Sequence, residues 1–465
     1  MRFLRLARFP LSTPSIAKVA TTAVLLLHYS TAFTMKPSPP LSYAPPKGTV
    51  TPFDLSAFSA KVVEREEKVQ SAYDSSRKFQ AALIKAKSEL NDSSEVDGLL
   101  QSLVPEEAPR DPRKANLSHR LEDYVRLKAY THFLETGNLL PPSDCKYATD
   151  EEYLAGACMG LAQDLSRYAM GRATARDVAS VSMARNLVQE IQTQLLQFDF
   201  RNGPLRRKYD GTKYALKTLE TLLYELSVTG SDEPDAKRFK EDLSSVIPET
   251  EIGDLRKRMD HRDVLRETLI KKSRDGQKAA KQAIFALHRG DKAKAMQLIQ
   301  ECENCIQNDL LPIVQEEPPL RSGSFTCVLE EYAEAKLFFA WLFGKNDDGE
   351  SPVGDLLAPQ DFPIELSPEE YLGGLCDLTG EVGRYAVQRG TARDADGVKL
   401  SLHSNSCILN ALQTMERTPS AINKKMDQLR RSVEKLERML YEMSLSEATG
   451  RNVQTSAEEM DTEEK

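Results

Sequence analysis

The sequence predicts an all-α protein made of two consecutive helical domains. The stretches 55–92 and 253–289 contain almost no proline or glycine, although the 465-residue chain holds 24 and 23 of them, and long runs without helix breakers favour helices. Apolar residues in the first stretch recur at close to helical spacing. A chain of this length also exceeds one ordinary hydrophobic core, so two domains are expected.

A tandem duplication supports this division. Residues 151–177 begin with EEYLAG and end with TARD, and residues 369–394 begin with EEYLGG and end with TARD. Apart from one extra residue in the first copy, the two stay in register, and Tyr385 lies 217 positions after Tyr168. This period is far longer than that of a solenoid, so each copy is a domain. Differences between the copies therefore indicate a division of roles.

Helical patterns and turn residues place the elements and boundaries. In the first domain, 54–228, helices are expected near 54–91, 115–136, 149–170, 174–199 and 204–228. In the second domain, 253–446, they are expected near 253–289, 292–315, 324–344, 367–389, 391–416 and 418–445. The polar segment 229–252 is interpreted as a linker, and the acidic segment 447–465 is expected to be disordered.

The N-terminal segment 1–53 has the composition of a targeting presequence followed by a disordered, Pro-rich stretch. It contains no acidic residue and carries an apolar run at 23–27 that is too short to span a bilayer. The alternative is that translation starts at Met35. The compartment is a plastid or a mitochondrion if residues 1–34 act as a presequence, and no membrane association of the mature protein is expected.

Overall charge and cysteine content exclude some classes of function. The net charge of −8 gives no support for nucleic-acid binding by bulk attraction, so such binding needs a local basic surface. Seven cysteines, an odd number in a large chain, do not indicate a disulfide framework. Cys302 and Cys305 have C-x-x-C spacing, but they lack a second pair and a nearby histidine, so we interpret them as helix cysteines.

Four acidic residues of the second domain form the candidate site. Glu331 and Glu334 are three residues apart, and Asp377 and Glu381 are four apart, so each pair shares a helix face. Carboxylates from two packed helices can hold Mg²⁺ or Mn²⁺, and a cation relieves their mutual repulsion, which otherwise raises the pKa of some of them. The alternative interpretation is an ordinary solvated helix face, because both spacings are common.

Three glycines beside Asp377 favour the site. Gly373, Gly374 and Gly380 lie on the same predicted helix as this acid. A glycine inside a helix costs about 1 kcal/mol relative to alanine. Their presence therefore predicts that another group approaches the backbone closely.

The first domain lacks this acidic set and carries basic residues instead. Glu331 corresponds to Asp123, Glu334 to Arg126, Asp377 to Met159 or Gly160, and Glu381 to Gln163 or Asp164, depending on where the extra residue is placed. Basic side chains suit phosphate contacts, and tyrosines can stack on unpaired bases. The predicted nucleic-acid-binding residues are Arg120, Arg126, Lys128, Arg206, Arg207 and Lys208, with Tyr124, Tyr130 and Tyr209 as stacking candidates.

Longer motifs resemble the translin family. The first domain is similar to translin through EEYLAG, DLSRY and residues 205–227, and the second is similar to translin-associated factor X through KKSRD, IFALHR, LEEYAEA and YLGGLCDLTGE. The resemblance implies helical domains of about six to seven helices each. It also implies self-association into a hollow oligomer that holds single-stranded RNA or DNA, in the cytoplasm and nucleus.

The resemblance further implies Mg²⁺-dependent endoribonuclease activity in the second domain. The acids of the family's motifs match Glu331, Glu334, Asp377 and Glu381, which are predicted to be both catalytic and metal-binding. The fusion departs from the family by fixing the two kinds of domain at equal numbers. Two alternatives stay open: a non-catalytic scaffold that binds single-stranded DNA or RNA, and a helical oligomer that binds no nucleic acid.

Overall fold

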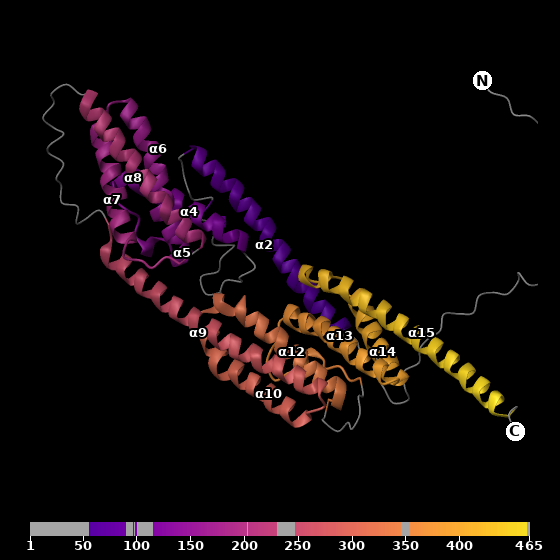
Figure 1. Ribbon diagram of the computed structural model, residues 1–465. Coiled ribbons are helices and arrows are strands. Elements are labelled where there is room, and N and C mark those ends of the chain that lie inside the picture. Colours follow the sequence, from indigo (N-terminus) through magenta and orange to yellow (C-terminus); the bar gives the residue numbers. More distant parts are fainter. Residues whose placement is uncertain are drawn as a thin grey trace, which may run out of the picture. The chain divides into compact units, whose positions relative to one another are not determined.

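The computed structural model describes residues 55–89, 96, 98–99, 115–201, 203–229, 247–345 and 354–462. Within these ranges the regular structure is helical and contains no strand (Figure 1), which confirms the all-α prediction. The predicted presequence, the Pro-rich segment and most of the predicted linker lie outside the described ranges. Over the residues described, no helix combines the length and apolarity needed to cross a membrane.

The helices follow the predicted order in both halves. The N-terminal half contains α2 (Ser56–Glu89), α4 (Ala115–Thr136), α5 (Asp150–Tyr153), α6 (Leu161–Thr174), α7 (Val178–Leu195) and α8 (Pro204–Thr229). The C-terminal half contains α9 (Glu249–His288), α10 (Lys292–Asn304), α11 (Leu311–Glu316), α12 (Ser324–Phe343), α13 (Pro368–Thr391), α14 (Ala395–Thr414) and α15 (Ser420–Thr462). Short 3₁₀ turns add η1 (Pro142–Asp144), η6 (Pro318–Arg321) and η7 (Pro359–Asp361).

Two helices extend beyond the limits predicted for the second domain. Helix α9 begins at Glu249, inside the predicted linker. Helix α15 continues to Thr462, so most of the acidic segment predicted to be disordered is helical. Extending an existing helix needs no new nucleus, which explains why this segment continues it without an apolar face.

The repeated TARD motif marks the same helix boundary in both halves. Arg176 and Arg393 adopt φ values of 60° and 58°, a left-handed conformation that ends the preceding helix. The next residue in each copy caps the following helix, because the Asp177 carboxylate accepts a hydrogen bond from the Ser180 N–H and Asp394 caps its own helix in the same way. The same motif therefore forms the same backbone turn and helix cap in both halves.

The extra residue of the first copy lies in a π-helical segment. Between α5 and α6 the chain forms η2 (Leu154–Gly160), whereas α13 runs through the equivalent region as an α-helix. A π-helical turn accommodates one inserted residue without breaking a helix. The register of 217 positions thus applies after this segment, and Asp164, rather than Gln163, corresponds to Glu381.

Within the described ranges each half has one large core, and the first turns of α2 and α9 are exchanged between these cores. The start of α2 packs in the core of the C-terminal half, while its later residues pack in the N-terminal core. Helix α9 does the reverse. The exchanged apolar residues are Leu55, Phe58 and Val62 of α2, and Ile252, Leu255 and Met259 of α9, each pair separated by 197 positions. The core boundaries therefore cross the predicted domain boundaries.

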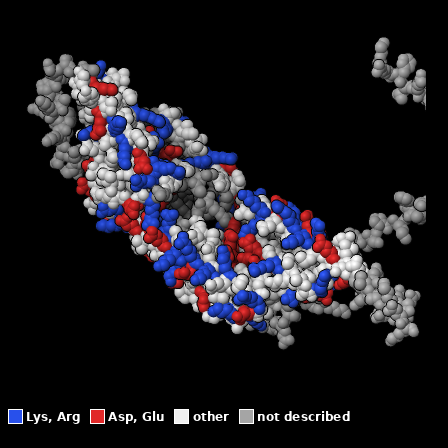
Figure 2. Space-filling view, viewed as in Figure 1, with Lys and Arg blue, Asp and Glu red and all other residues white. Residues whose placement is uncertain are grey.

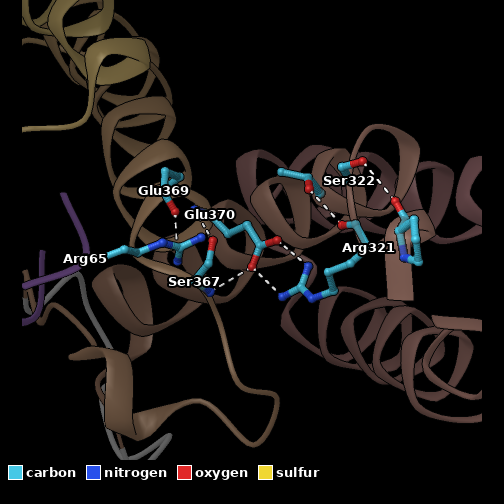
Figure 3. Close-up of polar contacts among 8 residues, drawn as sticks. Arg65, Arg321, Ser322, Ser367, Glu369 and Glu370 are labelled. Carbon is cyan, nitrogen blue, oxygen red and sulfur yellow. Dashed lines mark hydrogen bonds and ion pairs between the residues drawn. The ribbon is translucent and has the colours of Figure 1, made fainter. Parts of the chain in front are cut away.

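Matching ion pairs accompany this exchange. Arg65 of α2 lies 3.2 Å from Glu369 at the start of α13, and Arg262 of α9 lies 3.2 Å from Glu151 of α5. Figure 3 shows the first of these pairs beside Glu370, whose carboxylate accepts hydrogen bonds from the Arg321 guanidinium. The two halves thus contact each other through two equivalent, reciprocal junctions.

Candidate metal centre between α12, α13 and α15

Glycine allows α12 and α13 to approach closely at the candidate site. A methyl group at Gly374 would lie 2.7 Å from the Ala333 Cβ atom and 2.9 Å from the Glu330 carbonyl oxygen. At Gly373 it would lie 2.8 Å from the Glu330 side chain. Gly380 has no neighbour within 4 Å of such a methyl group, so the predicted close approach applies to the first two glycines only.

Asp377 is paired with a lysine from a third helix. The Lys425 Nζ of α15 donates to the Asp377 Oδ2 at 2.7 Å and to the Gly373 carbonyl oxygen at 3.3 Å. It also lies 3.4 Å from the Glu330 Oε2. Burial lowers the pKa of Lys425, but the ion pairs with Asp377 and Glu330 outweigh it, so the net shift is upward and the lysine stays charged.

Two other acids of the set are paired with α9. The Glu331 Oε1 lies 2.9 Å from the Lys281 Nζ. The Glu381 Oε2 contacts the His288 Nε2, and the His288 side chain is only 3% exposed. The other ring nitrogen of His288, Nδ1, is buried and has no hydrogen-bond partner. Each of these carboxylates therefore faces a cationic or proton-donating group of the protein through one oxygen.

Glu334 is the exception. No hydrogen bond or ion pair joins its carboxyl group to any other residue within the described ranges. Burial raises the pKa of Glu334 to about 8, and the negative charges of Asp377, Glu381 and Glu331 contribute to the increase, whereas Lys425 opposes it. The centre thus contains one carboxyl group that the rest of the protein does not neutralise.

The four predicted acids come together in one electrostatic group, but their oxygens do not form a ready coordination shell. As the side chains stand, the described part of the chain holds no cluster of three or more His, Cys, Asp or Glu residues placed to bind a metal ion. The donor set itself, carboxylate oxygens with one uncompensated acid, fits the preference of Mg²⁺ and Mn²⁺. Binding would require the carboxylates to turn from their present partners.

Sequence reasoning missed Lys425 and His288. The signal for Lys425 was present, because it lies 217 positions after Lys208, which belongs to the predicted basic set. His288 occupies the last turn of α9, and its ring lies 4.8 Å from that of Phe338. Its contact with Glu381 spans 93 residues of sequence, so no local pattern could reveal it.

The equivalent place in the N-terminal half is closed by an ion pair. Arg126, the counterpart of Glu334, donates two hydrogen bonds of 2.6 Å to the two carboxylate oxygens of Asp164, the counterpart of Glu381. Nearby, Lys208 pairs with Glu122. A bidentate arginine leaves its carboxylate no need for another cation. The N-terminal half thus has an arginine–carboxylate pair where the C-terminal half has two acids.

We expect the change Arg126→Met to destabilise the N-terminal half, because Asp164 would be left largely buried without a cation. The cost should be about 2–3 kcal/mol, measured as the free energy of unfolding in denaturant. The double change Arg126→Met with Asp164→Leu should recover most of this loss. Equal destabilisation in the single and double variants would show that the ion pair is not the cause.

Most of the predicted nucleic-acid-binding residues have internal partners. Arg126 and Lys208 form the ion pairs described above, and the Arg120 guanidinium donates to the Ser76 hydroxyl. The Arg206 Nε lies 3.5 Å from Asp210. Arg207 is exposed, and Lys128 lies over the Tyr124 ring. Of the six, Arg207 is the side chain most available for a phosphate.

The stacking prediction is wrong for two of the three tyrosines. Tyr124 and Tyr209 are 4% and 5% exposed, because both rings pack in the N-terminal core. Tyr130 is partly buried and packs edge-on against Tyr168. On the face shown in Figure 2, basic and acidic side chains are intermixed, and no continuous basic surface is visible.

Comparisons with known proteins identify relatives of both halves. The model of the translin family matches residues 54–230 and 264–447. The chain is 27% identical to a translin-associated protein X homolog of Schizosaccharomyces pombe over 204 residues, which cover 40% of this chain and 84% of that protein. It is 30% identical to translin of Homo sapiens over 129 residues, 25% of this chain and 56% of that protein. The matched segment thus spans little more than half of human translin.

Solved structures with some likeness include two titled "Crystal structure of apo-NeC3PO" and "Structure of AfC3PO - duplex RNA complex". Their TM-scores are both 0.36, and their sequence identities are 16% and 20%. They cover 46% and 42% of this chain, and 100% and 97% of their own chains.

Proposed function

This chain belongs to the translin family, with two family segments in one polypeptide, and from that premise we propose that it is a metal-dependent endoribonuclease acting on single-stranded RNA. The catalytic centre is assigned to the C-terminal half. The observation that carries the proposal is Glu334, a largely buried carboxyl group with a pKa of about 8 beside three other acids. Perturbed acids of this kind are found at functional sites more often than elsewhere.

In this proposal Glu331, Glu334, Asp377 and Glu381 hold Mg²⁺ or Mn²⁺. An ion held there would supply positive charge that lowers the pKa of a water molecule and offsets the negative charge on a phosphodiester. Glu334 offers a carboxyl group without a protein partner, whereas Glu331, Asp377 and Glu381 would have to turn from Lys281, Lys425 and His288. Lys281 and Lys425 keep positive charge beside the acids, where the phosphate of the RNA would also lie.

The test is cleavage of a labelled single-stranded RNA by the full chain, with Mg²⁺ and with EDTA. The change Asp377→Asn is expected to lower the cleavage rate at least about 100-fold, because the ion loses a charged ligand. The matched control is Asp164→Asn in the N-terminal half, which should leave the rate per folded protein unchanged. Undiminished cleavage by Asp377→Asn, or cleavage in EDTA, would contradict the proposal.

The second candidate function is a non-catalytic scaffold that self-associates and binds single-stranded DNA or RNA. It is favoured by the present pairing of three of the acids with Lys281, His288 and Lys425. It predicts retention of single strands at low salt without cleavage in any divalent ion. Mass measurement of the assembled protein, with and without an oligonucleotide, tests the proposed hollow oligomer in both cases.

A further inference from the structure

One ion pair is common to the two halves. Lys208 pairs with Glu122, and Lys425 pairs with Glu330. The two lysines are 217 positions apart, and the two glutamates are 208 positions apart. Each pair joins the last helix of a half, α8 or α15, to the helix α4 or α12. Since the N-terminal half has this pair without an acidic centre, the pair is part of the fold and does not depend on a metal.

Only the C-terminal half adds a second acid to this lysine. The Lys425 Nζ contacts Asp377 at 2.7 Å in addition to Glu330 and the Gly373 carbonyl oxygen. An ammonium group has three protons to donate, and these three acceptors satisfy them. The corresponding position in the N-terminal half is Met159 or Gly160, neither of which can accept such a contact from Lys208.

Resting on the proposed function above, we propose that Lys425 is a resident counter-ion: it occupies the cation position beside Asp377 until a divalent ion binds, and it competes with that ion for the carboxylate. The anchor for Lys425 is Glu330, which lies outside the four proposed ligands. When the ion arrives, the ammonium loses Asp377 and keeps Glu330, the contact that Lys208 makes with Glu122. Lys425 thus lets the C-terminal half fold around its group of acids without a metal ion.

Manganese titration of the full-length protein, followed by calorimetry, tests this inference. The change Lys425→Met should make Mn²⁺ bind about 5-fold to 10-fold more tightly, because a competing positive charge is removed. Lys425→Arg keeps the charge and should bind as the wild type does. Lys208→Met is the matched control, since it breaks the same ion pair in the other half, and it should leave Mn²⁺ affinity unchanged. Equal or weaker binding by Lys425→Met would overturn the inference.

Thermal unfolding in EDTA separates this inference from the proposed function. Lys425→Met leaves both Glu330 and Asp377 without a cation, whereas Lys208→Met leaves only Glu122. The melting temperature should therefore fall further for Lys425→Met than for Lys208→Met. If the wild type binds no Mn²⁺, the metal-dependent function and the competition fail together, and this difference then shows only that Lys425 stabilises the acids of the folded protein. Equal loss of melting temperature in the two variants would overturn the counter-ion role even if the wild type binds Mn²⁺ and cleaves RNA.

Discussion

The change Glu334→Gln is expected to abolish RNA cleavage and at the same time to stabilise the metal-free protein at alkaline pH. Glutamine has nearly the same shape but carries no charge, so it removes the repulsion among the acids of α12 and α13. A carboxyl group whose pKa rises from 4.5 to about 8 on folding holds its proton more tightly in the folded state. Loss of that proton therefore opposes folding.

The sign and range of the pH dependence follow from these two values. Below pH 4.5 Glu334 is protonated in both states, and the variant should match the wild type. Between pH 4.5 and 8 the folded state binds more protons, so wild-type stability falls as pH rises. Above pH 8 the variant should be more stable by on the order of 2–4 kcal/mol. Saturating Mg²⁺ should reduce this difference.

Denaturant unfolding in EDTA at pH 4.5, 6.5 and 8.5 measures the effect. Glu331→Gln is the control, because Glu331 is paired with Lys281 and its removal breaks an ion pair instead of relieving repulsion. The interpretation fails if Glu334→Gln gives the same free-energy difference at all three pH values. Loss of cleavage without this pH dependence would show that Glu334 acts in catalysis but that folding does not raise its pKa.

Phe58 belongs to the N-terminal half in sequence, but the change Phe58→Ala is expected to destabilise the C-terminal half. Its ring packs edge-on against Tyr371 of α13, with centroids 5.3 Å apart, in the C-terminal core. Since Phe58 is only partly buried, the loss should be about 2–3 kcal/mol. The mirror change Leu255→Ala, in α9, should destabilise the N-terminal core by a similar or larger amount.

Amide hydrogen exchange distinguishes the two effects by location. Phe58→Ala should lower protection in α13 and leave α6 unchanged, and Leu255→Ala should do the opposite. A loss of protection in α6 on changing Phe58 would mean that α2 belongs wholly to the N-terminal core. Combining both changes should give additive losses, because the residues lie in separate cores.

The order of the helices was accessible from sequence because each one carries a local signal. The long stretches without proline or glycine and the helical period of their apolar residues act within a few residues of the structure that they specify. The extra residue of the first copy was visible as well, but its position was not. Its position became clear only from the π-helical geometry of η2, which the spacing of apolar residues in the sequence does not indicate.

The candidate site was only partly predictable for a related reason. Glu331, Glu334, Asp377 and Glu381 stand out by their spacing and by the duplication, and glycines beside Asp377 predicted the close approach that Gly373 and Gly374 make. Their partners His288 and Lys425 come from α9 and α15, distant in sequence. Likewise, the basic residues of the N-terminal half looked free in sequence, yet Arg126 meets Asp164 only after folding.

The reciprocal placement of the first turns of α2 and α9 has a practical consequence for dissecting this protein. A fragment of residues 54–228 would keep the start of α2, which packs in the C-terminal core, and would lack the start of α9, which packs in its own core. A fragment of residues 253–446 would lack the start of α2 and also Ile252, the first of the α9 residues that pack in the N-terminal core. Each piece alone should expose apolar surface and aggregate. Co-expressed, the two pieces should assemble into a nicked complex, because every contact that joins them is still encoded on one piece or the other once residues 247–252 are kept.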